Sequence, residues 1–135
     1  MRTPLVVTAL IALLACSAGP AEAKQKKPCA RKGSDTVAAN RQARVYEIAN
    51  KDGGNNLYGC LRSNDRRQLL AHGYDDNYVS SGDYDEVKLR GHVVSWRFTE
   101  TDISCKADCP PEYDPTTETR YKRDLKRRKT SVKDG

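Results

Sequence analysis

The sequence predicts an all-β fold, a short antiparallel meander of about two four-stranded, blade-like sheets that disulfides stabilise. Three observations lead to this prediction. Stretches rich in strand-forming residues recur between turn residues, large apolar residues are scarce, with one Trp and one Phe in the chain, and the N-terminus has the features of an export signal. A small core in an oxidising compartment is typical of a disulfide-stabilised domain.

The first 23 residues have the composition of a secretory signal peptide. A basic start precedes the uncharged apolar run 5–15, and Ala21-Glu22-Ala23 is a small-x-small cleavage sequence. The run is shorter than the stretch of about 20 residues that a membrane-spanning helix needs. We therefore expect cleavage after Ala23, secretion, and a mature chain without a transmembrane span. One alternative stays open, because Leu13-Leu14-Ala15-Cys16 is a loose lipobox, through which a lipid on Cys16 would anchor the protein.

Removal of the signal leaves an even number of cysteines, Cys29, Cys60, Cys105 and Cys109. Four cysteines allow three pairings. Cys105 and Cys109 lie close together in a Pro-flanked loop, which favours a short bridge between them and leaves Cys29 to join Cys60. In the alternative, the two loop cysteines join the first part of the domain. Each structural disulfide contributes about 2–4 kcal/mol, which a core this small needs.

The residues after the signal divide into a basic extended segment, 24–34, and a single small β domain, 35–133. The domain contains a faint internal repeat. In both 35–71 and 87–133 an apolar strand precedes a strand with a Leu-Arg or Leu-Lys pair and a basic turn. We therefore expect two units of strands with a loop between them.

The first unit contains one ambiguous segment and one clear hairpin. Residues 35–50 permit a helix or strands, because a cap residue and alanines precede a run rich in strand formers. The turn Asp52-Gly53-Gly54-Asn55 separates that run from 57–61, and strand, Asp-Gly turn, strand is a strong hairpin signal. A turn at 63–65 and a strand at 66–71 complete the unit.

The second unit follows a polar loop predicted at 72–86. A strand begins at 87–89, Arg90-Gly91 makes a tight turn, and alternate apolar residues of the next strand share one face. These residues are Val94, Trp96 and Phe98. Residues 99–118 are turn-rich, and a further strand through Tyr121, Arg123 and Leu125 can pair with 130–132.

Four segments carry a family resemblance, GSDTVAANRQARVYEI, LYGCLRSNDRRQLL, VKLRGHVVSWRF and RYKRDLKRRKTSV. They resemble the blade units of secreted, propeller-like proteins of high-GC actinobacteria, whose function is uncharacterised. The resemblance covers roughly 33–133 and rests on a Gly-Cys-Leu-Arg strand, a Leu-x-Gly turn and an Asp-Leu-Arg/Lys strand. It implies about two blades, too few to close a ring of typically four to eight, and it supplies no catalytic residues.

Charge is segregated along the chain. Residues 24–32 carry five basic and no acidic side chains, residues 120–135 carry eight basic and two acidic ones, and 33–119 has a net charge of −5. Basic runs attract anionic polymers or lipid surfaces, or else form a solvated face with a loose terminal arm. The candidate anion-binding residues are Arg120, Lys122, Arg123, Lys126, Arg127, Arg128 and Lys129.

The predicted loop 72–86 is the candidate contact surface, because tyrosines lie beside carboxylates in it and tyrosine is common in binding surfaces. Its residues are Tyr74, Asp75, Asp76, Tyr78 and Tyr84. The acids lack the order of an EF-hand loop, and the cysteine and histidine spacings fit no zinc site. We expect no catalytic site, no metal and no cofactor.

A small exported domain with segregated charge and no catalytic motif is typical of a non-catalytic binding module. We predict contact with anionic cell-envelope polymers or with another protein. Nucleic acid is not expected as a partner outside the cell, and the oligomeric state is left open. Two alternatives remain. A small secreted hydrolase would use His72 or His92 beside a carboxylate or hydroxyl, and a structural envelope protein would assemble through open sheet edges.

Overall fold

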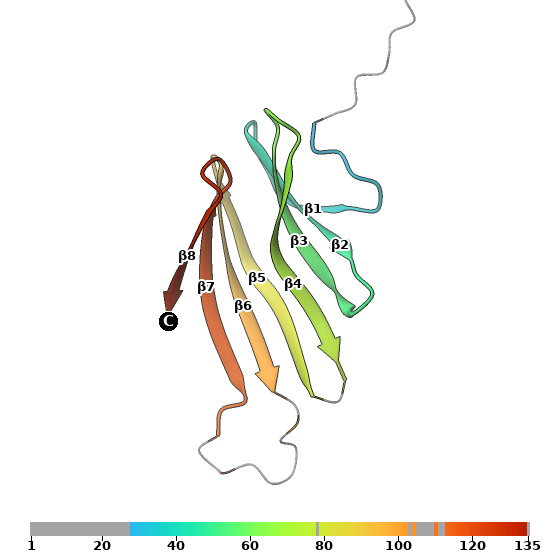
Figure 1. Cartoon of the computed structure of the whole chain (residues 1–135), viewed down its shortest axis with the longest axis vertical. Coiled ribbons are helices and arrows are strands. Elements are labelled where there is room, and N and C mark those ends of the chain that lie inside the picture. The colour runs from blue at the N-terminus through green and yellow to red at the C-terminus, as the bar shows by residue number, and fades with distance from the viewer. Residues whose placement is uncertain (1–27, 78, 103, 105–109, 111–112, 135) are drawn as a thin grey trace, which may run out of the picture.

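The computed structural model describes residues 28–77, 79–102, 104, 110 and 113–134. These residues form eight strands, β1 (Asp35–Ala39), β2 (Ala43–Ala49), β3 (Gly53–Leu61), β4 (Arg67–Asp76), β5 (Ser80–Arg90), β6 (Val93–Asp102), β7 (Thr116–Asp124) and β8 (Lys129–Asp134). Each strand pairs antiparallel with the next, so the strands form one open sheet in chain order (Figure 1). The predicted all-β antiparallel meander is confirmed. The division into two separate four-stranded sheets is not confirmed, because β4 and β5 pair and the sheet is continuous.

Residues 35–50, which permitted a helix or strands, form β1 and β2. Successive residues of β2 are buried on opposite faces, since Val45 faces the main core whereas Tyr46 packs in a second cluster behind the sheet. Burial with a period of two suits a strand and not a helix. The turn between the strands is held by Asn40, whose Oδ1 accepts the backbone N–H of Ala43 at 2.9 Å.

The prediction of a polar loop at 72–86 is wrong, because these residues form the end of β4, a short turn and part of β5. Side chains alternate here between solvent and interior: Asp83 is exposed, whereas Tyr84 is 9 % exposed and belongs to the core. A Cβ at Gly82 would lie 2.4 Å from the ring of Tyr74. This glycine therefore permits close packing within the sheet and does not mark the end of a strand.

The other local predictions hold with small changes of length. The hairpin around Asp52-Gly53 is β2–β3, the Arg90-Gly91 turn joins β5 to β6, and the return strand at 130–132 is part of β8. Val94, Trp96 and Phe98 face the main core together, as alternation predicts. The segment 99–118 is less turn-rich than expected, because β6 extends to Asp102 and β7 begins at Thr116.

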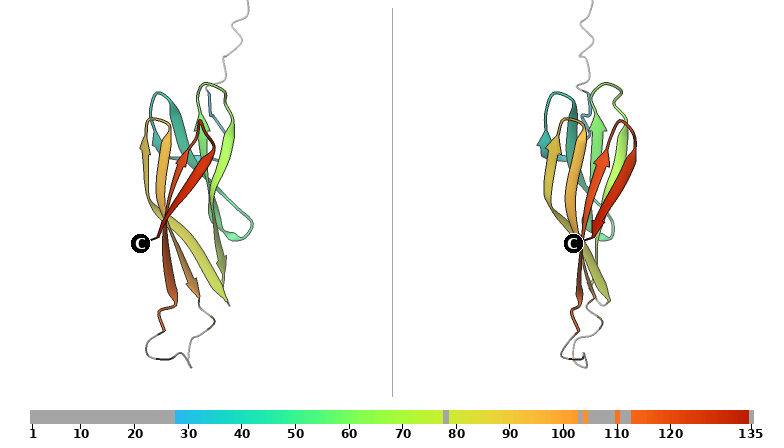
Figure 2. Two further views of the ribbon diagram at one scale, coloured as in Figure 1. Left: turned by 60° about the vertical axis from the view of Figure 1, so that its left-hand side comes forward. Right: turned by 90° about the vertical axis from the view of Figure 1, so that its left-hand side faces the viewer.

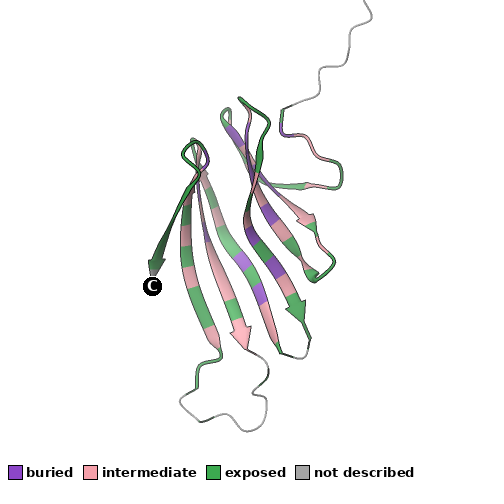
Figure 3. Cartoon of the chain, in the orientation of Figure 1, coloured by how far each residue is buried: buried purple, intermediate pink, exposed green. Residues whose placement is uncertain are grey.

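The continuous sheet folds over on itself between β4 and β5. These two strands pair only where Tyr74–Asp76 meet Ser80–Gly82, and beyond that point they diverge. Figure 2 shows the half with β1–β4, in blue and green, facing the half with β5–β8, in yellow and red. The main core lies between the halves, and Figure 3 shows buried and exposed positions alternating along the central strands. Its buried members are Ala43, Val45, Leu57, Leu61, Ala71, Tyr84, Val94, Trp96 and Leu125.

The N-terminal segment 28–34 packs against the side of strands β1–β4 that faces away from the main core. A disulfide joins Cys29 to Cys60, which confirms this part of the predicted pairing, while Cys105 and Cys109 lie outside the described residues. Asp65 adds two polar contacts: its Oδ1 accepts the backbone N–H of Cys29 at 2.6 Å and lies 3.1 Å from the Arg31 guanidinium. The predicted signal, 1–23, also lies outside the described residues.

Candidate anion-binding face

Strands β5–β8 present one face of their half to solvent, opposite the main core. The pairing register places Lys88 opposite Ser95, Ser95 opposite Lys122, and Lys122 opposite Ser131. Neighbouring strands lie about 4.8 Å apart, so the backbones of Lys88 and Lys122 are about 10 Å apart. The row across the four strands therefore alternates an ammonium group with a hydroxyl group.

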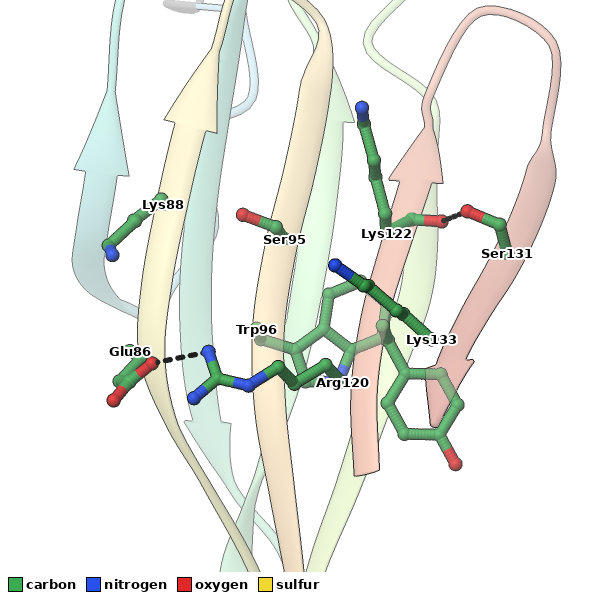
Figure 4. A pocket seen from close by; sticks show the side chains of 9 residues that line it. Glu86, Lys88, Ser95, Trp96, Arg120, Lys122, Ser131 and Lys133 are labelled. Carbon is green, nitrogen blue, oxygen red and sulfur yellow. Dashed lines mark hydrogen bonds and ion pairs between the residues drawn. The ribbon is translucent and has the colours of Figure 1, made fainter. Parts of the chain in front are cut away.

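A second row lies one step along the strands on the same face. Here Arg97 is opposite Arg120, and Arg120 is opposite Lys133. The two rows surround a hollow of about 300 Å³, whose lining includes Lys88, Lys122 and Lys133 (Figure 4). We call the residues Lys88, Ser95, Lys122, Ser131 and Lys133 the lysine face.

Aromatic packing on the core side supports the lysine face from behind. Trp96 is only 4 % exposed, and its ring stacks on that of Tyr121 with centroids 5.4 Å apart. In Figure 4 the Trp96 ring lies behind the strands, whereas Lys122 and Lys133 project in front of them. Because this stacked pair joins β6 to β7 beneath the hollow, it holds together the two strands that carry Ser95 and Lys122.

Where Glu86 and Arg120 line the hollow, the side chains form an ion-pair network. Arg97 pairs with Asp85 and lies 3.5 Å from Glu86, while Arg120 lies 3.0 Å from Glu86. The hydrogen bond from Arg97 lowers the pKa of the Asp85 carboxyl, and the same bond raises the pKa of Arg97. Asp85 and Arg97 therefore stay charged at neutral pH. Arg97 and Arg120 are thus already neutralised by the acids with which they pair.

The three lysines of the lysine face differ from these arginines. Within the described part of the chain, Lys88, Lys122 and Lys133 make no ion pair. An ammonium group is a strongly hydrated point charge with three donors, which suits a phosphate or carboxylate oxygen. Three such groups with the Ser95 hydroxyl can therefore bind an anionic unit that is small enough for the hollow, whereas the Ser131 hydroxyl donates to the Lys122 carbonyl at 3.3 Å.

The structure separates the predicted anion-binding residues into three places. Arg120 and Lys122 lie on the outer face of β7, and Lys129 begins β8. Arg123 points to the other side, where it donates to Gln68 Oε1 at 3.0 Å. The others, Lys126, Arg127 and Arg128, are exposed in the turn between β7 and β8.

Two lysines of the hollow were missed by the sequence prediction. Lys133 belongs to the basic C-terminal run but was not selected, and Lys88 lies in a separate part of the sequence. A signal for Lys133 was available, since it alternates with Ser131 on one side of a strand. Lys88 had no such signal, because its neighbours across β6 depend on the pairing register.

The predicted contact surface is only partly assembled. Tyr74, Asp75 and Asp76 line a shallow hollow of about 630 Å³ at the end of β4, together with Asp52 and His72. The Tyr74 hydroxyl donates to Glu100 Oε1 at 2.7 Å, and this bond raises the pKa of the phenol.

The other two residues of that prediction do not join this hollow. Tyr84 is a core residue whose hydroxyl donates to Glu47 Oε2 at 3.1 Å, so it cannot form a contact surface. Burial and the bond to Glu47 together raise the pKa of Tyr84. Tyr78 lies outside the described residues.

Both histidines meet a carboxylate, as a hydrolase would require. His72 Nε2 lies 3.3 Å from Asp52 Oδ2 and its Nδ1 lies 2.6 Å from Asn56 Oδ1. His92 Nε2 lies 3.5 Å from Asp124 Oδ1 and its other nitrogen contacts a glutamine side chain. Both ring nitrogens of each histidine thus lie beside a polar side chain.

Cys29, Cys60 and Asp65 lie close enough together to hold a metal ion, but the disulfide uses both sulfur atoms. In the part of the chain that the structure describes, no helix has the length and hydrophobicity to cross a membrane. Comparisons with protein-family models, curated proteins and solved structures found no match to this chain.

Proposed function

We propose that the protein is a secreted, non-catalytic module that holds an anionic cell-envelope polymer on the lysine face. The observation that carries the proposal is the group of three lysines without ion pairs around one hollow. On the same face Arg97 and Arg120 already have acidic partners, so a ligand that brings its own negative charges meets mainly the lysines and the neighbouring Arg90, which makes no ion pair with the described residues. Export is the expectation from residues 1–23.

Repeating phosphodiesters are the ligand chemistry that fits best. The row across the strands alternates lysine with serine, and its two lysines stand about 10 Å apart at the backbone. Successive phosphates of a polyol-phosphate chain could each meet an ammonium group while the polyol hydroxyls meet Ser95 and Ser131. Binding of this kind weakens steeply with salt, because each neutralised phosphate releases counterions.

The test is retention on a purified polyol-phosphate wall polymer over a range of salt concentrations. The variant K88Q/K122Q/K133Q should lose most retention, and its slope of log affinity against log salt should fall by about 2–3. The matched control K32Q/K51Q/K126Q removes the same charge away from the lysine face. It should keep the wild-type retention and the wild-type slope of log affinity against log salt. Equal losses in the two variants, or no retention by the wild type, would overturn the proposal.

We also propose that the two halves of the sheet are related blade-like units. The internal repeat of the sequence aligns β2 with β6, β3 with β7, and the turn after β3 with the turn after β7. Both of these turns are basic, and both lie at the same end of the sheet (Figure 1). This correspondence supports the resemblance to secreted propeller-like proteins. An experimental structure in which β1–β4 and β5–β8 fail to superpose strand for strand would refute it.

A further inference from the structure

The turns after β1, β3, β5 and β7 gather at one end of the molecule, as a meander requires (Figure 1). The N-terminal segment that the disulfide holds lies at the same end. We call this end the basic platform. It consists of residues 28–34, 40–42, 62–66, 90–92 and 124–128.

Hydrogen bonds join these turns to one another, although they come from distant parts of the chain. The backbone N–H of Arg62 donates to the carbonyl of Gln42 at 2.9 Å, and its Nε donates to the carbonyl of Asn40 at 2.9 Å. Asn40 Nδ2 in turn donates to the carbonyl of Gly91 at 2.9 Å. The turn after β1 is thereby fixed to the turns after β3 and β5.

The remaining parts of the platform are joined in the same way. The backbone N–H of Leu125 donates to the carbonyl of His92 at 3.0 Å, which links the turns after β7 and β5. The N-terminal segment is linked to the turn after β3 by the bond between Cys29 and Asp65. The platform is therefore one connected surface whose backbone is ordered before any ligand binds.

The platform concentrates positive charge. It carries nine basic and two acidic side chains, a net charge of +7. The basic ones are Arg31, Lys32, Arg41, Arg62, Arg66, Arg90, Lys126, Arg127 and Arg128. The two acids, Asp65 and Asp124, are engaged within the platform, since Asp65 pairs with Arg31 and Asp124 accepts the backbone N–H groups of the last turn.

The opposite end of the sheet has the opposite charge. Its described residues at 50–54, 74–77, 79–82, 100–102 and 113–115 carry six acidic side chains and one basic side chain, a net charge of −5. The molecule is thus a charge dipole along the strands. Such a dipole orients the protein as it approaches a charged surface, with the platform leading.

We propose that the basic platform docks end-on against the phosphate headgroups of an anionic lipid bilayer. The platform adjoins the lysine face, because Arg90 lines a hollow together with Lys88, Ser95 and Lys122. The tips of four turns project together from one end of the sheet, which lets them touch a flat surface at once (Figure 1). A flexible polymer would instead follow a groove or hollow, as on the lysine face. The cations of the platform are open to solvent: the Arg127 side chain is 80 % exposed, although its Nε also lies 3.8 Å from Asp124 Oδ2.

Vesicle binding tests this proposal. The wild type should bind vesicles that contain about 30 % phosphatidylglycerol in phosphatidylcholine, should not bind pure phosphatidylcholine, and should dissociate near 1 M salt, where the Debye length is about 3 Å. The variant R41Q/R66Q/R127Q/R128Q should bind about 600-fold more weakly, because it removes four cations and each cation at an anionic surface accounts for about a fivefold change. Circular dichroism and intact mass establish that each variant is folded and oxidised.

The matched control is K51Q/K88Q/K122Q/K133Q, which removes four charges off the platform and should keep wild-type vesicle binding. Equal weakening by both variants would overturn the proposal, because net charge alone would then explain binding. Loss of polymer retention without loss of vesicle binding in the platform variant would also overturn it and assign the platform to the polymer. If the lysine face failed to bind polymer, the vesicle binding expected of the platform variant and of its control would stay the same. The two proposals can therefore fail separately.

Discussion

The contact between Leu125 and Gly59 should determine how firmly the two halves of the sheet are held together. Leu125 lies in the turn after β7 and is 1 % exposed, and its δ carbons rest over the backbone of Gly59 in β3. Replacement by alanine should cost about 2–5 kcal/mol of the free energy of unfolding, the range for a fully buried leucine. A domain of this size has about 5–15 kcal/mol in total, so the loss is a large fraction.

The opposite perturbation is the addition of a methyl group at Gly59. A Cβ there would lie 2.6 Å from Leu125 Cδ2 and 3.3 Å from Leu70 Cδ1. Gly59→Ala should therefore force the halves apart and cost about 1–3 kcal/mol. In the double variant, which combines Gly59→Ala with Leu125→Ala, the shortened side chain at 125 leaves room for the new methyl group. The combined cost should fall below the sum of the single costs by about 0.5–3 kcal/mol.

Urea unfolding followed by tryptophan fluorescence measures these values, with the disulfide kept oxidised in every variant. Leu69→Ala is the control, because Leu69 is 52 % exposed on the outer side of β4 and should lose about 1 kcal/mol or less. If Leu125→Ala cost no more than Leu69→Ala, the halves would not be packed through this turn. Additive costs in the double variant would show that Leu125 and Gly59 are not in contact.

Two further predictions concern the disulfide and a buried phenol. Replacing both Cys29 and Cys60 by alanine should cost about 3–4 kcal/mol, because the bond closes a loop with a sequence separation of 31; an unchanged urea midpoint would contradict this. Burial and the Glu47 hydrogen bond raise the pKa of Tyr84 above its unfolded value of about 10. The contribution of neutral Tyr84 is therefore complete below pH 10 and is lost as pH rises through the folded pKa. Tyr84→Phe should flatten the fall of the urea midpoint above pH 10, and identical pH profiles would count against the assignment.

Local chemistry in the sequence was enough to predict the hairpins. The Asp52-Gly53 turn lies between two runs of strand formers, and the alternation of Val94, Trp96 and Phe98 reports a strand with one buried face. These signals need only a few adjacent residues. They fixed strands and turns but carried no information about where the continuous sheet folds over.

The mistaken loop at 72–86 shows why composition misleads. Glycines and acids at high density normally indicate a turn, but here the acids cover the solvent side of two strands. Gly73 and Gly82 are required by close approach, since a Cβ at Gly73 would lie 2.8 Å from the Asn55 carbonyl oxygen. That requirement arises between strands and is invisible in the segment itself.

Only part of the lysine face could be predicted from the sequence, because its residues meet through the pairing of strands. Arg120 and Lys122 stand out as part of a basic run, but Lys88 lies 34 residues before Lys122 and reaches it only across β6. The platform was harder still. Its arginines at 41, 66 and 90 come from three separate parts of the sequence, and only the meander brings them to one end.

The open edges of the sheet bear on the alternative of a self-assembling envelope protein. An edge strand recruits another chain when it is long, flat and uncharged. β1 has five residues and a register shift between Thr36 and Ala38, which interrupts a continuous ladder. β8 carries Lys129 and Lys133, and a second copy paired along it would bring like charges together. Both edges thus have the features that oppose pairing, and this favours a module that binds other molecules over one that extends its own sheet.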